Sequence, residues 1–172
     1  MEIFDIYDKN RVKTAKTRAR GEKPLPGEYV LIVMVLIFNS NGQMLIQRRQ
    51  DNLDWAPGMW TMTAGGGTQS GETTAAAAVR ELREELGIEV ILPPRPQFSM
   101  THKFGFSDYY LITDDIDISR IKVPNAEVAE VRWVDKAEML AMAAAGECVP
   151  YRPSFVEFCF DMGQKYGLTD WD

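Results

Sequence analysis

The chain has 172 residues, a formal net charge of −6 and an apolar fraction of 45%. Its length fits one domain of ordinary size, and its apolar fraction suffices for a hydrophobic core. The negative charge argues against a protein that coats nucleic acid and against a polybasic membrane anchor, so neither partner is expected.

Targeting signals and cysteine usage point to a cytoplasmic protein. Residues 1–9 are mixed and acidic, and the longest apolar run, Tyr29–Phe38, is too short to span a bilayer. The only two cysteines, Cys148 and Cys159, have no spacing or histidine partners that favour a disulfide or a metal site. We expect buried thiols in a reduced compartment.

The first predicted elements precede the central strand. Glu2–Tyr7 alternates weakly and predicts an edge strand, and the basic stretch Lys9–Lys23 predicts a hairpin or loop over the core. This basic arm is either solvated surface or a cover for a phosphate-rich ligand, and the sequence leaves both open.

A β-hairpin is predicted next. Tyr29–Phe38 is rich in β-branched residues and predicts the central strand, and an Asn-Gly turn leads into Gln43–Gln47, which pairs back. Arg48 and Arg49 follow at the end of the second strand. Because arginine suits bidentate phosphate binding, both are candidates for substrate contacts.

A glycine-rich segment follows the short predicted strand Met59–Thr63. Gly65, Gly66, Gly67 and Gly71 are expected in one loop, where glycine permits positive φ and close approach of the backbone to a ligand. A loop that leads into a helix start suits phosphate or metal binding. A flexible surface loop is the alternative.

Three glutamates crowd the end of the helix that follows. Glu81, Glu84 and Glu85 stand at i, i+3 and i+4, where like charges cost about 0.2–0.5 kcal/mol per pair. The negative end of the helix dipole adds to this cost. A hard divalent cation such as Mg²⁺ would reverse it, whereas the pattern taken alone also fits a solvated acidic face.

The opposite side of this helix is apolar and predicts packing on a sheet. Gly87 is placed to end the helix in the left-handed conformation, and Arg80 and Arg83 flank the acids. The apolar stripe consists of Ala75, Ala78, Val79, Leu82 and Leu86.

The whole segment resembles the Nudix box, whose pattern is a glycine, five residues, a glutamate, seven residues and then R-E-U-x-E-E-x-G-U, with U aliphatic. The runs LIQRR, PGMWTMTAGGG and EVAEVRWV look like the Nudix subgroup similar to isopentenyl-diphosphate isomerase. Every specified position of the box is filled, by Gly66, Glu72, Arg80, Glu81, Leu82, Glu84, Glu85, Gly87 and Ile88.

The resemblance implies a Mg²⁺ or Mn²⁺ site against a substrate diphosphate. Glu81 and Glu85 look like the principal metal ligands, Glu84 a third, and Gly66 a carbonyl ligand. One of the carboxylates, or a water that they hold, would act as general base.

Supporting residues also follow from the resemblance. Glu72 and Arg80 look like a salt bridge that fixes the loop on the helix. A further acid is expected from outside the box, and Glu127, Glu130 and Asp108 are equally placed candidates.

The remaining elements complete an α/β pattern, which predicts a mixed sheet between helices. The resemblance implies a Nudix-like α/β/α sandwich in a single domain 1–172, with an N-terminal strand and basic arm (1–27), a core (28–150) and a C-terminal helix (151–172). The remaining expected strands are Gln97–Phe104, Tyr109–Thr113 and Val128–Val134, with Trp133 inside, and the remaining helices are Lys136–Ala145, capped by Gly146, and Ser154–Lys165.

The function predicted from the box is metal-dependent hydrolysis of a phosphoanhydride bond in a nucleoside diphosphate derivative or a related diphosphate. One alternative is an isopentenyl-diphosphate isomerase, disfavoured because Trp60–Ala64 has no cysteine and the one histidine, His102, lies downstream. Another is a non-catalytic nucleotide sensor, disfavoured because all three acids are kept.

Two features stay open at this level. His102 either contacts substrate or fills a strand end, and the aromatic residues either stack a base or fill the core. The resemblance leaves the substrate unidentified and makes a homodimer one option. The aromatic candidates are Trp55, Trp60, Phe104 and Phe106.

Overall fold

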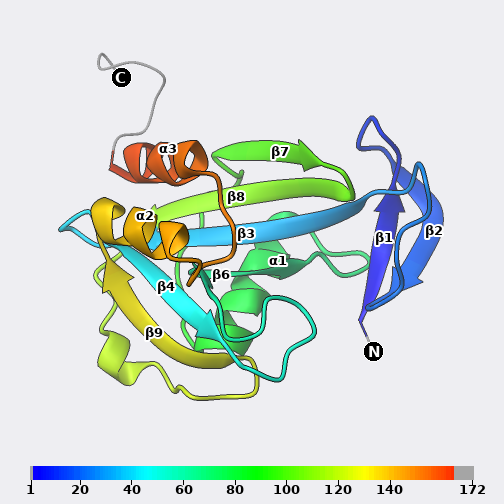
Figure 1. The fold of residues 1–172 in the computed structure, drawn as a ribbon. Helices are drawn as coiled ribbons and strands as arrows, with labels where there is room; N and C mark the ends of the chain where they lie inside the picture. The colour runs from blue at the N-terminus through cyan, green and yellow to red at the C-terminus, as the bar shows by residue number, and fades with distance from the viewer. Residues whose placement is uncertain (1, 165–172) are drawn as a thin grey trace, which may run out of the picture.

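The computed structural model describes residues 2–164. An N-terminal hairpin of β1 and β2 is followed by a seven-stranded sheet and its helices (Figure 1). The strands are β1 Ile3–Tyr7, β2 Lys13–Ala19, β3 Val30–Phe38, β4 Met44–Arg49, β5 Trp60–Met62, β6 Ala64–Gly67, β7 Phe98–His102, β8 Gly105–Thr113 and β9 Val128–Val134; the helices are α1 Thr74–Glu81, α2 Lys136–Ala144 and α3 Pro153–Gln164, with the short turns η1 Leu82–Leu86 and η2 Ile118–Arg120.

The large sheet is mixed, as predicted. Its main order is β5-β4-β3-β8-β7, with β6 paired to β3 and β9 paired to β4. The β3–β8 pair is parallel, while β6, β4 and β7 join their neighbours in antiparallel fashion. β3 touches β4 at its last residue, where Phe38 faces Met44, so the two strands diverge toward the other end of the sheet.

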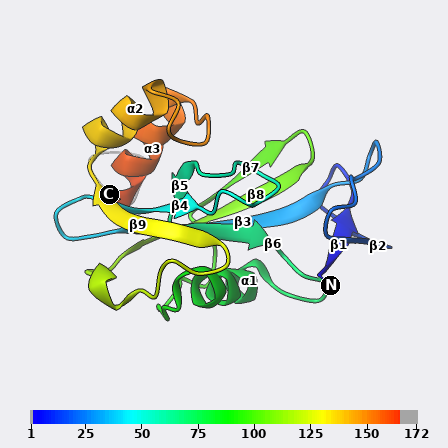
Figure 2. The same cartoon turned by 60° about the horizontal axis from the view of Figure 1, so that its bottom comes forward.

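The sheet lies between two helical layers, which confirms the predicted α/β/α sandwich. Figure 2 shows α1 on one side and α2 with α3 on the other. Val33, Val35 and Ile37 of β3 pack toward α1, while Leu36 and Phe38 pack toward α2 and α3. Alternate side chains of a strand point to opposite faces, so the continuous apolar run of β3 contributes side chains to the hydrophobic core on each face of the sheet.

The glycine-rich segment differs from its prediction. Gly65, Gly66 and Gly67 belong to β6 and pair with β3, whereas a loop was expected. The three glycines therefore form regular β-sheet pairs with β3. Because they have no side chain, other residues can approach the backbone of β6 closely. A methyl group on Gly67 would collide with the Phe4 ring.

The box helix has two parts. α1 is α-helical, and its continuation η1 is a π-helical turn that ends at Gly87, with φ 66° and ψ 24°. Ala77 and Ala78 are fully buried against the sheet, whereas Val79 is half-buried, so the predicted stripe is shifted by a fraction of a turn. A π turn needs an i→i+5 hydrogen bond and is common at functional sites.

The basic arm is a hairpin, as one of the two predicted forms. Its strand β2 pairs with β1, and its turn is fixed by an ion pair from Arg11 to the buried Asp108 at 2.5 Å. Asp5 of β1 accepts hydrogen bonds from Ser70 Oγ at 2.8 Å and Gly71 N at 3.0 Å. The hairpin is therefore joined both to the sheet and to the segment before α1.

Glu28 holds the base of this hairpin. It accepts hydrogen bonds from the backbone of Leu25 and from the side chains of Lys16 and Arg18. These bonds, led by the one from the Leu25 N–H, lower the pKa of Glu28 to about 2.

Other predictions differ from the structure only in their bounds. The second of the late strands begins at Gly105, earlier than predicted, because it pairs along the full length of β3. The last helix begins at Pro153, and of the predicted C-terminal region residues 165–172, including Lys165, lie outside the described residues. Both cysteines are buried free thiols, and no helix within residues 2–164 is long and apolar enough to cross a membrane.

Candidate active site

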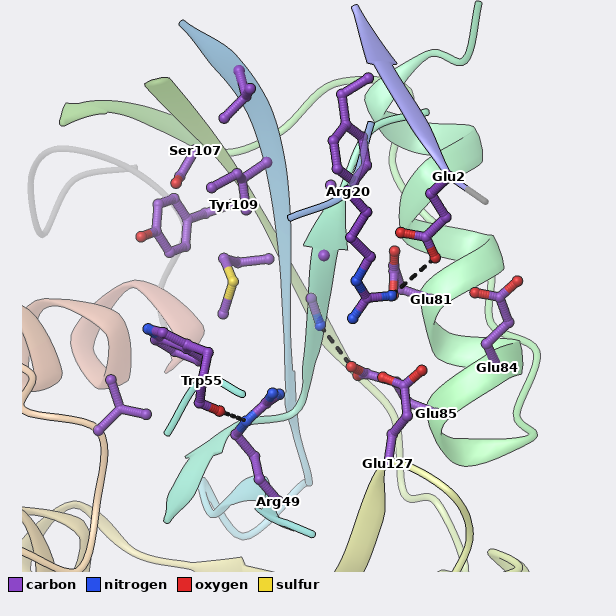
Figure 3. A pocket seen from close by; sticks show the side chains of 18 of the residues that line it. Glu2, Arg20, Arg49, Trp55, Glu81, Glu84, Glu85, Ser107, Tyr109 and Glu127 are labelled. Carbon is purple, nitrogen blue, oxygen red and sulfur yellow. Dashed lines mark hydrogen bonds and ion pairs between the residues drawn. The ribbon is translucent and has the colours of Figure 1, made fainter. Parts of the chain in front are cut away.

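A cavity of about 520 Å³ opens between β3, β6, the box helix and the N-terminal hairpin (Figure 3). One side of the cavity is charged, and the other side is apolar and aromatic. The charged lining consists of Glu2, Arg20, Arg49, Glu81, Glu84, Glu85 and Glu127, and the apolar and aromatic lining includes Phe4, Val30, Ile32, Met34, Trp55, Tyr109, Val149 and Tyr151.

Glu85 is the most enclosed acid of this cavity, with 2% of the residue exposed. Its Oε2 accepts a hydrogen bond from Gln47 Nε2 at 2.8 Å and another from Gly65 N at 3.2 Å. Both donors reach the same oxygen, which leaves the lone pairs of Oε1 for a cation or another donor.

Glu81 lies directly against β6. It is also buried, with 8% of the residue exposed, and a methyl group on Gly66 would collide with its carboxylate. A larger residue at position 66 would therefore push this carboxylate out of its place.

Arg80 links the helix of the box to the segment that precedes it. It donates to Glu72 at 2.9 and 3.0 Å and to the carbonyl of Gly67 at 2.9 Å. The predicted Glu72–Arg80 salt bridge is therefore present. The same guanidinium pairs with Glu81 at 2.7 Å and with Glu84 at 3.0 Å.

Glu84 is oriented differently from the other two acids. Its side chain is 52% exposed and points to Arg80, although it still borders the cavity. Each residue of a π turn advances by a smaller angle than in an α-helix, so Glu84 is rotated away from Glu81 while Glu85 stays on the cavity side. The side-chain directions expected for a regular α-helix therefore do not hold beyond Glu81.

Burial and repulsion perturb the two inner acids. Burial first, and then the charge of Glu81, raise the pKa of Glu85 to about 8. Burial also raises the pKa of Glu81, against the lowering effect of Arg80. A pair of buried carboxylates that resists ionisation is a frequent mark of a functional site.

These acids fit a divalent cation, although they do not form a closed cage. Within residues 2–164, no three His, Cys, Asp or Glu side chains converge into a ready-made ion site. Mg²⁺ does not need one, because it keeps several waters and is held by one or two carboxylates together with substrate phosphates. A cation beside Glu81 and Glu85 would also remove the penalty that raises their pKa values.

The structure separates the other predicted acids and arginines. Arg49 and Glu127 line the cavity. Arg48 instead binds Asp51 and the carbonyl of Gly58, and Glu130 sits opposite Arg48 on β9. Neither Arg48 nor Glu130 lines this cavity, whereas Arg49 and Glu127 do, so the structure brings only one arginine and one glutamate of the four predicted residues to it.

Asp108, the third candidate for a further acid, does not line the cavity. Its carboxylate accepts hydrogen bonds from Arg11 and from Ser99 Oγ, each at 2.5 Å. Glu127 is placed by its loop, because Asn125 donates to the backbone carbonyl of Glu85 at 2.8 Å and binds the amides of residues 127 and 128.

Of the four aromatic candidates, one borders the cavity. Trp55 lies there with Arg49 stacked 5.0 Å from its ring centroid. Trp60 is buried in the core beside α2, and Phe106 packs on Tyr29. Phe104 is exposed in the turn after β7, so of the four candidates Trp55 alone is placed where it could stack on a ligand in the cavity.

His102 ends β7, which is the structural role that the sequence allowed for it. Its Nδ1 accepts a hydrogen bond from the amide of Phe104 at 3.3 Å, and it does not line the cavity. Burial lowers the pKa of this imidazole.

Sequence reasoning missed several residues of the site. Gln47, which donates to Glu85, and Tyr109, which lines the cavity, are predicted only as strand residues, because the alternation of a strand does not show which face meets a cavity. Glu2 lies in the predicted edge strand and Arg20 in the basic arm, and their positions depend on how the hairpin docks. Only the high density of polar residues in this arm gave a signal.

Comparison with known proteins gives the family. The model of the NUDIX domain matches residues 28–152. The chain belongs to the Nudix family. It is 44% identical over 152 residues to an uncharacterised Nudix hydrolase of Listeria innocua, a match that covers 88% of this chain and 90% of the relative.

Other Nudix relatives agree. A Nudix hydrolase of Deinococcus radiodurans is 35% identical over 133 residues, covering 74% of this chain and 76% of the relative. An isopentenyl-diphosphate Delta-isomerase of Klebsiella pneumoniae is 32% identical over 144 residues, covering 78% and 76%. The crystal structure of DR0079 from Deinococcus radiodurans has a TM-score of 0.77 and 28% identity, with 92% of this chain and 99% of that chain covered.

These similarities show that the chain is a hydrolase and support, in general terms, a pyrophosphohydrolase function. Nudix hydrolases generally use divalent cations. The match confirms the predicted family and the predicted fold. The region matched by the family model begins at residue 28 and does not include the N-terminal hairpin.

Proposed function

We propose that this Nudix protein cleaves a phosphoanhydride bond in a nucleoside diphosphate derivative or a related small diphosphate by water attack. The observation that carries this proposal is the pair of buried carboxylates, Glu81 and Glu85, at the charged end of the cavity. Their burial is costly for the protein alone and becomes favourable with a cation and a phosphate ligand.

Glu81 and Glu85 would hold Mg²⁺ or Mn²⁺, with Glu84 and the Gly66 carbonyl as further proposed ligands. When bound, such an ion neutralises phosphate charge and lowers the pKa of water. Glu84 would have to leave Arg80; the Glu84 side chain is 52% exposed, so water can solvate it when the pair breaks, and Arg80 keeps Glu72 and Glu81 as partners.

The protein itself positions these groups and can accept a proton. Gln47 and Gly65 orient Glu85, and Arg80 orients Glu81. One of the carboxylates of the box, or a water that they hold, would take the proton from attacking water. The apolar side of the cavity would receive the group attached to the diphosphate.

An isomerase of isopentenyl diphosphate is the principal alternative, since relatives of that name match the chain. The isomerases of this family use a cysteine and histidines at the site. The lining of the described cavity contains neither type, and Cys148 lies in the core beside α2. This favours hydrolysis over carbon protonation.

The decisive experiment is a substrate panel. Nucleoside di- and triphosphates, nucleotide sugars and isopentenyl diphosphate are incubated with the protein, with and without Mg²⁺ or Mn²⁺. We expect metal-dependent cleavage of at least one anhydride, detected as its two phosphate-bearing products. Glu85→Gln should remain folded and lose about 10²-fold or more of this turnover.

A non-catalytic sensor predicts the opposite result. It would bind a nucleotide with metal, measured by calorimetry, without turnover at any enzyme concentration. A cytoplasmic location, and assembly as a homodimer, remain predictions that fractionation and light scattering can check.

A further inference from the structure

The N-terminal hairpin forms one wall of the cavity, although it lies outside the part of the chain that matches the family model, 28–152. It contributes Phe4 from β1, Glu2 from just before that strand and Arg20 from just after β2. The cavity therefore combines residues of the matched region with a cation that precedes that region.

Arg20 starts from a fixed backbone. Its amide donates to the carbonyl of Glu2 at 2.9 Å, and the ring of Phe4 occupies the space that the missing side chain of Gly67 leaves. Asp5 ties the same strand to Ser70. A side chain that leaves a docked hairpin pays less entropy for binding than one on a loose arm.

The guanidinium of Arg20 is held weakly. It pairs with Glu2 at 3.0 Å, and the two side chains are 57% and 30% exposed. Figure 3 shows the pair on the rim, with the guanidinium turned toward Glu81. An exposed ion pair contributes little, so exchange of Glu2 for a more highly charged partner is easy.

The other arginines of the site are committed elsewhere. Arg80 binds three carboxylates and a backbone carbonyl. Arg49 donates to the carbonyl of Trp55 at 2.8 Å and stacks on its ring. Among residues 2–164, five glutamates and two arginines line the cavity, and Arg20 is the arginine whose pairing a phosphate can most readily replace.

We propose that Arg20 binds a phosphate group of the diphosphate substrate, and that Glu2 holds the guanidinium in place until the phosphate displaces it. This inference rests on the proposed function. A planar guanidinium matches two phosphate oxygens at once, and it would balance part of the substrate charge that the metal does not neutralise. Arg20 is a substrate-binding residue in this scheme, and it does not handle the proton.

The test measures binding and turnover separately. Methylenediphosphonate, a diphosphate analogue whose P–C–P bridge resists hydrolysis, is titrated calorimetrically into wild type and Arg20→Ala in the presence of Mg²⁺. We expect the affinity to fall about 10- to 100-fold, as for loss of a charge-assisted hydrogen bond. With a hydrolysed substrate from the panel, KM should rise by a similar factor while kcat changes less than about threefold.

Matched variants separate this role from general charge effects. Lys23→Ala removes an exposed cation just beyond the hairpin, and it should leave both quantities within twofold. Arg20→Lys should recover part of the affinity. Glu2→Gln should tighten methylenediphosphonate binding, and it should do so by a larger factor in wild type than in Arg20→Ala, because competition for the guanidinium exists only in wild type.

The outcomes are distinguishable. If wild type hydrolyses a diphosphate but Arg20→Ala keeps KM and affinity within twofold of wild type, the proposed role of Arg20 is overturned and the proposed function stands. Equal effects of Glu2→Gln in both backgrounds overturn the competing role of Glu2. Wild type that neither binds methylenediphosphonate nor hydrolyses any member of the panel overturns the proposed function itself.

Discussion

Replacement of Glu85 by glutamine should stabilise the metal-free protein at alkaline pH while it removes activity. The carboxyl of Glu85 is 2% exposed at the residue level and sits beside Glu81. Glutamine has nearly the same shape, and its carbonyl can still accept from Gln47 and Gly65. The substitution therefore removes a buried charge without opening a cavity.

The magnitude follows from the pKa of this group. A rise from 4.5 to about 8 corresponds to about 4–5 kcal/mol against folding when the carboxyl is ionised, since a tenfold change in proton affinity is about 1.4 kcal/mol. Part of that cost belongs to the repulsion with Glu81, and relaxation lowers it further, so we expect about 3 kcal/mol.

The sign of the pH dependence is fixed by the direction of the shift. The folded pKa lies above the unfolded one, so the contribution of Glu85 is most favourable below pH 4.5 and is lost as pH rises to about 8. Wild type and Glu85→Gln should therefore be equally stable near pH 4.5. At pH 9 the variant should be more stable by about 3 kcal/mol, or about 6–12 °C in Tm for a chain of this size.

Thermal and urea unfolding in the presence of a chelator measure this difference. Glu84→Gln is the matched control, because that side chain is 52% exposed and its removal should leave the pH dependence unchanged. Mg²⁺ should restore stability to wild type at pH 9 and have less effect on Glu85→Gln. A stability difference that does not vary with pH, or a wild type that is more stable than the variant at pH 9, would refute the reasoning.

Three further predictions concern the frame of the site. Arg80→Ala should lower the free energy of unfolding by about 2–4 kcal/mol in urea titrations, because it leaves buried acceptors without their donor, whereas Arg83→Ala, at an exposed pair, should change it by less than about 0.5 kcal/mol. Gly66→Ala should keep the circular dichroism spectrum and lose about a hundredfold in turnover, because its methyl group displaces the carboxylate of Glu81; unchanged turnover would contradict that contact. The pKa of Glu28 is lowered to about 2, first by a backbone hydrogen bond, so the stability that this carboxylate contributes is present above pH 4.5 and is lost as pH falls toward 2. Glu28→Gln should therefore make stability less dependent on pH over that range. An acid-unfolding transition that is the same in the variant would contradict this role of Glu28.

The sequence predicted those parts of the site that lie close together along the chain. The i and i+4 spacing puts Glu81 and Glu85 on one side of a helix, and the resemblance to the Nudix box implied the pairing of Glu72 with Arg80. The apolar run of β3 and the turn after it were also predictable, because alternation, β-branching and an Asn-Gly pair are local signals.

Local patterns failed where pairing or docking decides the outcome. The glycines of β6 were expected in a loop because nothing in their own sequence shows that β3 lies alongside. Glu84 was expected with its neighbours because a regular helix was assumed, and a π turn is not visible in the pattern of residues. Arg48 and Arg49 are adjacent in sequence, yet only Arg49 reaches the cavity, because alternate residues of a strand face opposite ways.

The sequence by itself determined the family, the layered α/β fold and the acidic chemistry of the box, because each depends on spacing within a short stretch of chain. Only the tertiary structure decided which acids are buried, which arginine is available and that the N-terminal hairpin closes one wall of the cavity. Those features depend on contacts between segments that are far apart in the chain, and burial, which sets the pKa of Glu85, arises only when those segments come together.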